Sequence, residues 1–366
     1  MAQALYRKYR PKKLAEVLGQ ETNMLILKNA AKAGRLGQAY IFHGPRGTGK
    51  TTTARLLAKL LNCEKRRDDP EFAKLGEPCN ECRECRAIDT QNSFDVIEID
   101  AASNRGIDEI RNLRESIRTS PASAPHKVYI IDEAHMLTGP AFNALLKTLE
   151  EPPRHAVIVL ATTEYEKLPA TITSRAQRFT FKKHSKVTIM EKLAMIAKAE
   201  KITIDEPALE LIAAAAEGSF RDAESLLDQI SSLTENINLA TVERVTGRTG
   251  LKKIHELAAL ILAKDAKGAL AYISLLTDEG YNLVQFARDL IHYLRKVLSL
   301  KVNPSLEKIF EKELTRDEIA AVKKLAVSAD AAFLVKFIKS LIRAYSEMRY
   351  SPFAIVPLEI VIIESL

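Results

Sequence analysis

A glycine-rich run with one lysine and two threonines lies between residues 44 and 51, at a spacing suited to nucleotide phosphates. It reads Gly-Pro-Arg-Gly-Thr-Gly-Lys-Thr and fits the pattern G-x-x-x-x-G-K-[ST]. An apolar stretch, Tyr40-Ile41-Phe42, precedes it, and a helical pattern follows. This context favours a phosphate-binding loop over an ordinary glycine-rich turn. The expected phosphate-binding residues are Gly44, Gly47, Thr48, Gly49, Lys50, Thr51 and Thr52.

Each residue type in this loop has a physical task. Glycines let backbone N–H groups surround the phosphates at the positive end of the following helix. Lys50 supplies a point charge to the β and γ oxygens, and the Thr51 hydroxyl ligates Mg²⁺. The loop therefore predicts that ATP and Mg²⁺ bind here.

Paired carboxylates follow a second apolar strand some 80 residues downstream, in Val-Tyr-Ile-Ile-Asp-Glu-Ala-His at 128–135. Asp132 can hold the Mg²⁺ shell, while Glu133 can orient and deprotonate an attacking water. Acids that are merely solvated at a strand end are the plain alternative, which the upstream loop disfavours. Asp-Glu-Ala-His also occurs in helicases, but those need a second strand-rich domain, and residues 185–366 read as helical.

All four cysteines fall in one window with the spacing C-x15-C-x2-C-x2-C, at Cys63, Cys79, Cys82 and Cys85. Four thiolates suit tetrahedral Zn²⁺, and cytosolic disulfides are rare. An iron–sulfur cluster usually adds a Cys-Pro close downstream, which is absent here. We therefore favour a structural zinc site over a cluster or free thiols.

The elements that must position these groups alternate between short apolar runs and helical patterns as far as residue 181, which is typical of a parallel sheet wrapped by helices. The expected strands are Ala39–His43, Val96–Ile99, Val128–Ile131, Val157–Thr162 and Arg178–Phe181. The expected helices are 49–62, 107–119, 140–149, 187–201, 207–217, 221–233 and 239–246. Strands are not expected beyond about residue 185.

The predicted fold is thus α/β followed by all-α, in three domains. An ATPase domain of five parallel strands covers 1–181 with a zinc module inserted at 63–85, a helical lid covers 182–245, and a helical collar covers 246–366. Apolar residues at helical spacing in the collar are expected to hold neighbouring subunits together, the alternative being a self-contained core. They are Leu257, Leu260, Ile261, Phe333, Phe337 and Leu341.

Composition and charge further limit the class of protein to which this chain can belong. The chain has 366 residues, of which 46% are hydrophobic, and 54 Lys plus Arg against 47 Asp plus Glu. No stretch reaches the roughly 18 apolar residues of a membrane span, and the N-terminus has no apolar signal core. We expect a soluble cytoplasmic protein that does not contact membranes. Five basic residues precede the first acid, Glu16, but charge alone does not decide for nucleic-acid binding.

The motifs together resemble the gamma/tau family of bacterial DNA polymerase III subunits, ATPases of the sliding-clamp loader in the AAA+ superfamily. Tyr-Arg-Lys-Tyr-Arg-Pro at 6–11 and Val-Leu-Gly-Gln at 17–20 resemble the family's adenine cradle, which implies base contacts from Tyr6, Arg10, Pro11 and Val17. Ser174-Arg175-Ala176 is similar to its Ser-Arg-Cys motif, with alanine in place of a thiol that carries no chemistry. The sequence Gly-Ser-Phe-Arg-Asp-Ala at 218–223 resembles its sensor 2 helix.

This resemblance implies roles for three more residues. Thr163 would act as sensor 1 beside the γ-phosphate, and Arg221 would contact phosphates in its own chain. Arg175 would be an arginine finger for the ATP of a neighbouring subunit. The family also implies a zinc module in the first domain. The full catalytic set is then Lys50, Asp132, Glu133, Thr163, Arg175 and Arg221.

The resemblance also implies an ATPase within the polymerase III holoenzyme that opens, loads and releases the sliding clamp. Its partners would be delta and delta-prime subunits, copies of itself in a pentameric ring, the beta clamp and primer-template DNA. Arg105 and Lys147 match family positions that face DNA, though either could be a solvated charge. Two other classes stay open, a translocase or Holliday-junction AAA+ enzyme and a nucleotide-gated scaffold without turnover. The cysteine window and the opening Tyr-Arg-Lys-Tyr-Arg-Pro argue against the translocase, and intact Lys50, Glu133 and Arg175 argue against the scaffold.

Overall fold

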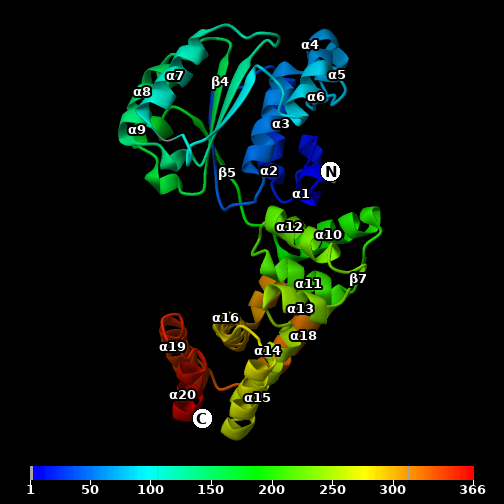
Figure 1. Cartoon of the computed structure of the whole chain (residues 1–366), viewed down its shortest axis with the longest axis vertical. Helices are drawn as coiled ribbons and strands as arrows, with labels where there is room; N and C mark the ends of the chain where they lie inside the picture. Colours follow the sequence, from blue (N-terminus) through cyan, green and yellow to red (C-terminus); the bar gives the residue numbers. More distant parts are fainter. Residues whose placement is uncertain (1–2, 105, 311–313) are drawn as a thin grey trace. The chain divides into compact units, whose positions relative to one another are not determined.

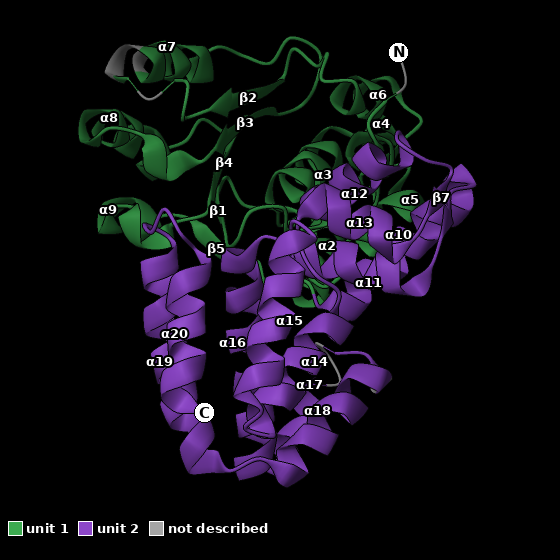
Figure 2. Ribbon diagram, turned by 60° about the horizontal axis from the view of Figure 1, so that its bottom comes forward, with its two compact units in different colours: residues 1–184, 219–221 green, residues 185–218, 222–366 purple. Residues whose placement is uncertain are grey.

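The computed structural model describes residues 3–104, 106–310 and 314–366, which belong to two compact units (Figures 1 and 2). Unit 1 groups residues 1–184 with 219–221, and unit 2 groups residues 185–218 with 222–366. The three-domain division at residues 181 and 245 stays a prediction.

A five-stranded parallel sheet of order β2-β3-β4-β1-β5 forms the centre of unit 1. This confirms the predicted sheet, and each predicted strand bound is within one residue of the observed one. The strands are β1 (Ala39–His43), β2 (Val96–Asp100), β3 (Lys127–Asp132), β4 (Ala156–Thr162) and β5 (Gln177–Thr180).

Helices cover both faces of this sheet (Figure 1), so that β3 and β4 are apolar on both sides. Tyr40 and Phe42 join one core with Leu57 of α3, whereas Ile41 joins the opposite core with Leu145 of α8. The helices of unit 1 are α1 (Leu5–Lys8), η1 (Leu14–Glu16), α2 (Glu21–Lys32), α3 (Lys50–Asn62), α4 (Glu64–Asp68), α5 (Pro70–Ala73), α6 (Arg83–Asp89), α7 (Ile107–Arg118), η2 (Ala134–Met136), α8 (Gly139–Glu150), η3 (Tyr165–Lys167) and α9 (Ala170–Thr173). Because the strands are parallel, the carboxyl ends of β1, β3 and β4 lie at the same edge of the sheet.

Unit 2 is helical apart from a short parallel pair, β6 (Thr203–Ile204) with β7 (Asn236–Ile237). The expectation of no strands beyond residue 185 was therefore wrong, because two-residue strands are too short to show a period. The helices are α10 (Lys186–Glu200), α11 (Glu206–Ala215), α12 (Phe220–Ser231), α13 (Leu239–Thr246), α14 (Leu251–Leu262), α15 (Ala266–Asp278), α16 (Leu283–Val302), η4 (Pro304–Leu306), α17 (Glu307–Phe310), α18 (Arg316–Ser328), α19 (Ala331–Met348) and α20 (Ile355–Ser365). Among the described residues, no helix is both long and apolar enough to cross a bilayer.

The apolar residues predicted to join neighbouring subunits lie instead in the core of unit 2. Leu257, Ile261, Phe337 and Leu341 are at most 1% exposed, and Leu260 and Phe333 pack against them. Helical periodicity marks a buried face but does not say whether the same chain or another chain buries it. Apolar side chains left exposed on α19 and α20 are Val335, Ile342, Val356, Ile360 and Ile363.

A buried ion-pair cluster joins the predicted lid to the predicted collar within unit 2. The Lys186 Nζ lies 2.8 Å from Glu210 and 2.5 Å from Glu318, and Thr315 donates a hydrogen bond to Glu210. Burial raises the pKa of Glu318, while the Lys186 ammonium opposes that shift. Removing Lys186 would leave two carboxylates together without a counter-ion.

Candidate active site and metal centre

The loop between β1 and α3 is too tight for larger residues at two positions. Gly44 and Gly47 have φ angles of +144° and +72°. A Cβ on Gly44 would lie 2.2 Å from the Phe181 carbonyl oxygen, and one on Gly47 would lie 1.8 Å from the Ser219 hydroxyl. Both clashes are with atoms of unit 1. Glycine is therefore required here by conformation and by space.

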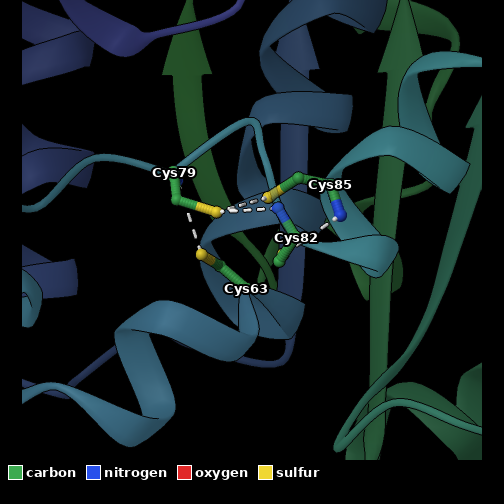
Figure 3. Close-up of side chains that lie close together, drawn as sticks. All are labelled: Cys63, Cys79, Cys82 and Cys85. Atoms are coloured by element: carbon green, nitrogen blue, oxygen red, sulfur yellow. Dashed lines mark hydrogen bonds between the residues drawn. The ribbon is translucent and has the colours of Figure 1, made fainter.

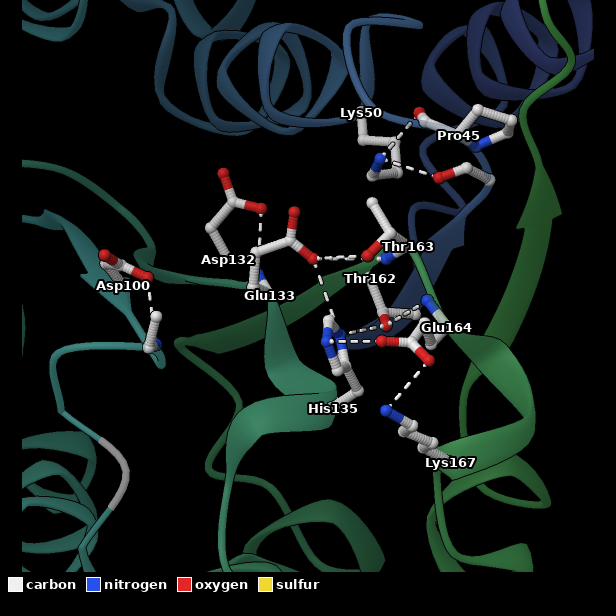
Figure 4. Close-up of polar contacts among 12 residues, drawn as sticks. Pro45, Lys50, Asp100, Asp132, Glu133, His135, Thr162, Thr163, Glu164 and Lys167 are labelled. Carbon is white, nitrogen blue, oxygen red and sulfur yellow. Dashed lines mark hydrogen bonds and ion pairs between the residues drawn. The ribbon is translucent and has the colours of Figure 1, made fainter. Parts of the chain in front are cut away.

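Lys50 begins α3 and turns its ammonium back into the loop. Its Nζ donates to the carbonyl oxygens of Gly44 and Pro45 at 2.8 and 2.9 Å, and the side chain is 6% exposed (Figure 4). Burial lowers the pKa of Lys50, and the nearby carboxylates of Glu133 and Asp132 oppose that fall. The loop thus holds one partly desolvated cation beside two acids.

Thr51 and Asp132 meet although 81 residues separate them. The Thr51 hydroxyl donates to Asp132 Oδ2 at 2.7 Å, because α3 begins beside the carboxyl end of β3. A hydroxyl and a carboxylate side by side are oxygen ligands of the kind that Mg²⁺ takes. Thr52 is half-buried on the same turn, and Thr48 is buried and donates to the Pro45 carbonyl oxygen.

Glu133 lies in a backbone conformation that few non-glycine residues adopt. Its φ and ψ are +46° and +45°, the left-handed region, which costs about 1–3 kcal/mol at a non-glycine residue. The turn directs its carboxylate toward the end of β4, where Thr163 donates to Oε2 from its hydroxyl at 2.9 Å and its N–H at 3.3 Å. The predicted base and the predicted sensor 1 residue are therefore in contact.

His135 and Thr162, which lie beside the Glu133 carboxylate, were not predicted as site residues from the sequence. His135, on η2, lies 3.4 Å from Glu133 Oε2 through Nδ1 and 3.2 Å from Glu164 Oε1 through Nε2 (Figure 4). Thr162, at the end of β4, lies 3.0 Å from the same Nδ1. The only signal in the sequence is the Asp-Glu-Ala-His tetrapeptide itself, which ends in His135 and also occurs in helicases.

Several of the residues predicted to contact the adenine base or the phosphates lie together within unit 1. Val17 is buried, and a Cβ on Gly49 would lie 4.0 Å from it. The Arg221 guanidinium lies 5.2 Å from the Tyr6 ring centroid, so sensor 2 reaches the opening segment. Arg10 and Pro11 are half-buried in that segment.

The predicted finger and DNA residues lie apart from these contacts. Arg175, just after α9, pairs with Glu150 at 2.8 Å and donates to the Thr171 carbonyl oxygen at 2.7 Å. Lys147 is exposed on α8. Arg105 lies outside the described residues. The roles of these three residues stay predictions.

The four cysteines converge to one point, as predicted (Figure 3). Their Sγ atoms all lie within 4.8 Å of one another, and those of Cys79 and Cys85 are 3.9 Å apart. Zn–S bonds of about 2.3 Å in a tetrahedron place sulfurs roughly 3.8 Å apart. Backbone N–H groups of Cys79, Glu81 and Cys82 donate to cluster sulfurs at 3.2–3.4 Å. This geometry fits a tetrahedral metal ion.

The protonation of the cluster gives a second reason for a metal. None of the four cysteines forms a disulfide. A hydrogen bond from Cys85 lowers the pKa of Cys63 to about 4, and the same contact, with burial, raises that of Cys85. Without a cation, one thiolate thus suppresses ionisation of its neighbour. A divalent ion would remove this conflict, so the donor set fits the expected Zn²⁺.

Two buried charged residues tie the cysteine module to the nucleotide-binding elements. Lys59 of α3 is 1% exposed and pairs with Asp89 at 2.5 Å and Asn80 at 2.9 Å. Glu77 accepts from the N–H groups of Leu14 and Ala15 and so caps η1, which leads to Val17. Neither residue was singled out from the sequence, because burial of a charge cannot be read from composition.

The parallel sheet, phosphate loop and paired carboxylates define a P-loop nucleotide-binding protein of the AAA+ type. Three family models match in succession: "DNA polymerase III, delta subunit" at residues 19–185, "DNA polymerase III clamp loader subunit, ATPase lid domain" at 188–234, and "DNA polymerase III subunits gamma and tau domain III" at 237–365.

Individual relatives agree with these models. DNA polymerase III subunit gamma of Buchnera aphidicola is 34% identical, over 100% of this chain and 98% of its own length. Subunit tau of Bacillus subtilis is 43% identical over 95% of this chain, which spans only 60% of that relative. Among solved structures, the RuvB branch migration motor of Thermotoga maritima is 20% identical, with a TM-score of 0.47, over 69% of this chain and 79% of its own. The chain belongs to the gamma/tau family of bacterial DNA polymerase III subunits.

Proposed function

We propose that this chain is an ATP-hydrolysing subunit of a bacterial clamp loader, in which ATP binding and hydrolysis drive opening, loading and release of a sliding clamp on primed DNA. The observation that carries the proposal is the convergence of Lys50, Thr51, Asp132, Glu133 and Thr163 at one edge of the sheet. The partners that we infer from the family are delta and delta-prime subunits, further copies of this chain and the beta clamp.

ATP binding would depend on the phosphate-binding loop and the Lys50 ammonium. The Lys50 ammonium can exchange the Gly44 and Pro45 carbonyl oxygens for phosphate oxygens without leaving the loop. Thr51 and Asp132 would hold Mg²⁺, which neutralises charge on the phosphates when bound. Tyr6, Arg10, Pro11 and Val17 would contact the base, and Arg221 the phosphates.

Hydrolysis would depend on the Glu133 carboxylate, which follows the Mg²⁺ ligand Asp132 in the chain. Glu133 would take a proton from the attacking water, while Thr163 holds its Oε2 and keeps the other oxygen free to face the phosphates. Charge developing on the transferred group would be met by Lys50 and by Arg175 of a neighbouring subunit. Fast turnover would then require an assembled ring.

The cysteine cluster would hold Zn²⁺ in a structural role, because four sulfur ligands leave no open position for water. Primer-template DNA would contact Lys147 and Arg105 through phosphates, which need basic groups rather than base readers. Both the zinc site and the DNA contacts are proposals that go beyond membership of the family.

A clamp-loading assay tests the proposal directly. The chain, reconstituted with delta, delta-prime, clamp, ATP and primed circular DNA, should leave clamps that remain on circles and slide off after linearisation. A translocase would move along DNA without depositing clamps, and a scaffold would assemble without releasing phosphate. Either result would contradict the proposal.

Lys50→Ala is expected to abolish measurable ATP binding. The change removes the buried ammonium of the loop, whose other cation, Arg46, is exposed. A lost charge-assisted contact of about 3 kcal/mol weakens affinity by about a hundredfold. Calorimetric titration with ATP and Mg²⁺ measures it, with exposed Lys147→Ala as the matched lysine control. Unchanged affinity in Lys50→Ala would remove Lys50 from the binding site.

Replacing Cys79 and Cys82 with serine should release one zinc ion per chain and lower the melting temperature by roughly 5–10 °C, or about 2–3 kcal/mol for a unit of this size. Elemental analysis and thermal unfolding measure the two effects. Glu81→Ser with Arg83→Ser, two exposed residues on either side of Cys82, is the control and should keep the metal. Iron, or no metal at all, in the unmodified protein would overturn the assignment.

A further inference from the structure

His135 is buried between two acidic side chains behind the active site (Figure 4). Its side chain is 7% exposed. Nδ1 lies 3.4 Å from Glu133 Oε2, and Nε2 lies 3.2 Å from Glu164 Oε1. A histidine placed between two carboxylates is rarely a filler of apolar space, since its ring carries one or two N–H donors.

The orientation of this ring is fixed from several sides. Nε2 faces the Glu164 carboxylate, which can only accept a hydrogen bond. Nδ1 lies 3.0 Å from the Thr162 hydroxyl, which in turn accepts from the Glu164 N–H at 3.0 Å. Lys167 pairs with the outer oxygen of Glu164 at 2.8 Å. The ring therefore cannot turn without breaking several contacts.

The ring closes one side of the space around the Glu133 carboxylate. Thr163 holds Oε2 through two hydrogen bonds, and His135 lies against the same oxygen. No hydrogen bond reaches Oε1 from the described part of the chain. With one oxygen anchored, the other is left for the side of the phosphate loop, where Lys50 lies near enough for the Glu133 charge to act on it.

We propose that His135 is a positioning residue, whose ring, locked by Thr162 and Glu164, holds the Glu133 carboxylate in the orientation that activates water. The proposal rests on the proposed ATPase function and adds a residue that touches neither phosphate nor water. Catalytic geometry is sensitive to displacements of about 1 Å, which can cost roughly 10²-fold in rate.

The test is a KM-against-kcat separation in His135 variants of the assembled loader. His135→Ala is expected to lower kcat by roughly tenfold to a hundredfold while the dissociation constant for ATP stays unchanged. Asparagine can place an amide near the position of Nδ1, beside Thr162 and Glu133, whereas glutamine reaches the position of Nε2. His135→Asn should therefore recover more of kcat than His135→Gln.

A second histidine, which is half-buried, supplies the matched control. His155 approaches the Ile117 carbonyl oxygen at 3.0 Å through its ring, away from the loop. His155→Ala should change stability without changing kcat. Equal kcat in His135→Ala and wild type, a higher kcat, or no gain from asparagine over alanine would overturn the positioning role. Absence of turnover in the wild-type assembly would instead refute the proposed function.

Discussion

Arg175→Ala is expected to leave ATP binding unchanged and to slow hydrolysis in assembled rings by roughly 10³- to 10⁵-fold, the contribution of an arginine finger. Its present partner, Glu150, forms a half-exposed ion pair at 2.8 Å. Such pairs contribute about 0–1 kcal/mol, so Arg175 can leave Glu150 at little cost. Single-turnover phosphate release measures the rate, and exposed Arg118→Ala at the end of α7 is the arginine control.

Mixing decides whether this arginine acts across an interface. Rings that combine Arg175→Ala chains with Lys50→Ala chains contain interfaces where an intact loop meets an intact finger. These rings should recover part of the activity that neither variant has alone. No recovery at any mixing ratio would mean that Arg175 acts only within its own chain, or not at all.

Glu133→Gln is expected to keep ATP affinity within a few-fold of wild type and to lower turnover by roughly 10²- to 10⁴-fold. The amide preserves the shape of the side chain and can still contact Thr163, but it cannot take a proton from water. Phosphate release and an ATP titration on the same sample separate the two effects. Glu151→Gln, just after α8, is the control. Near-normal phosphate release in Glu133→Gln would show that another group serves as the base.

The parts of the fold that the sequence predicted are those with strong local signals. β3 and β4 are largely apolar and β-branched runs buried on both faces, so they could be recognised as strands without tertiary information. β6 and β7 gave no signal because two residues complete no period. The apolar faces of α14 and α19 were found correctly, but their burial within unit 2 depends on helices far along the chain.

In the candidate site, too, features with a local sequence signal were predicted and long-range contacts were not. The phosphate loop and the four cysteines have fixed local spacings, which made their convergence predictable. The His135 contacts join the residues after β3 to the end of β4, and Glu77 reaches η1 from 62 residues away. Such contacts depend on how the strands align and where loops return, which residue types alone do not determine.

The measurement that tests the account most directly is ATP turnover by the purified chain, first alone, then with delta and delta-prime subunits, and finally with the clamp and primed DNA. The account predicts slow turnover by the chain alone and a stepwise rise as the ring, the clamp and the DNA are added. The rise should be absent from matched assemblies that carry Arg175→Ala. Turnover that is equally fast in all three mixtures, or undetectable in the complete one, would contradict the claim that this chain is a clamp-loader ATPase acting across subunit interfaces.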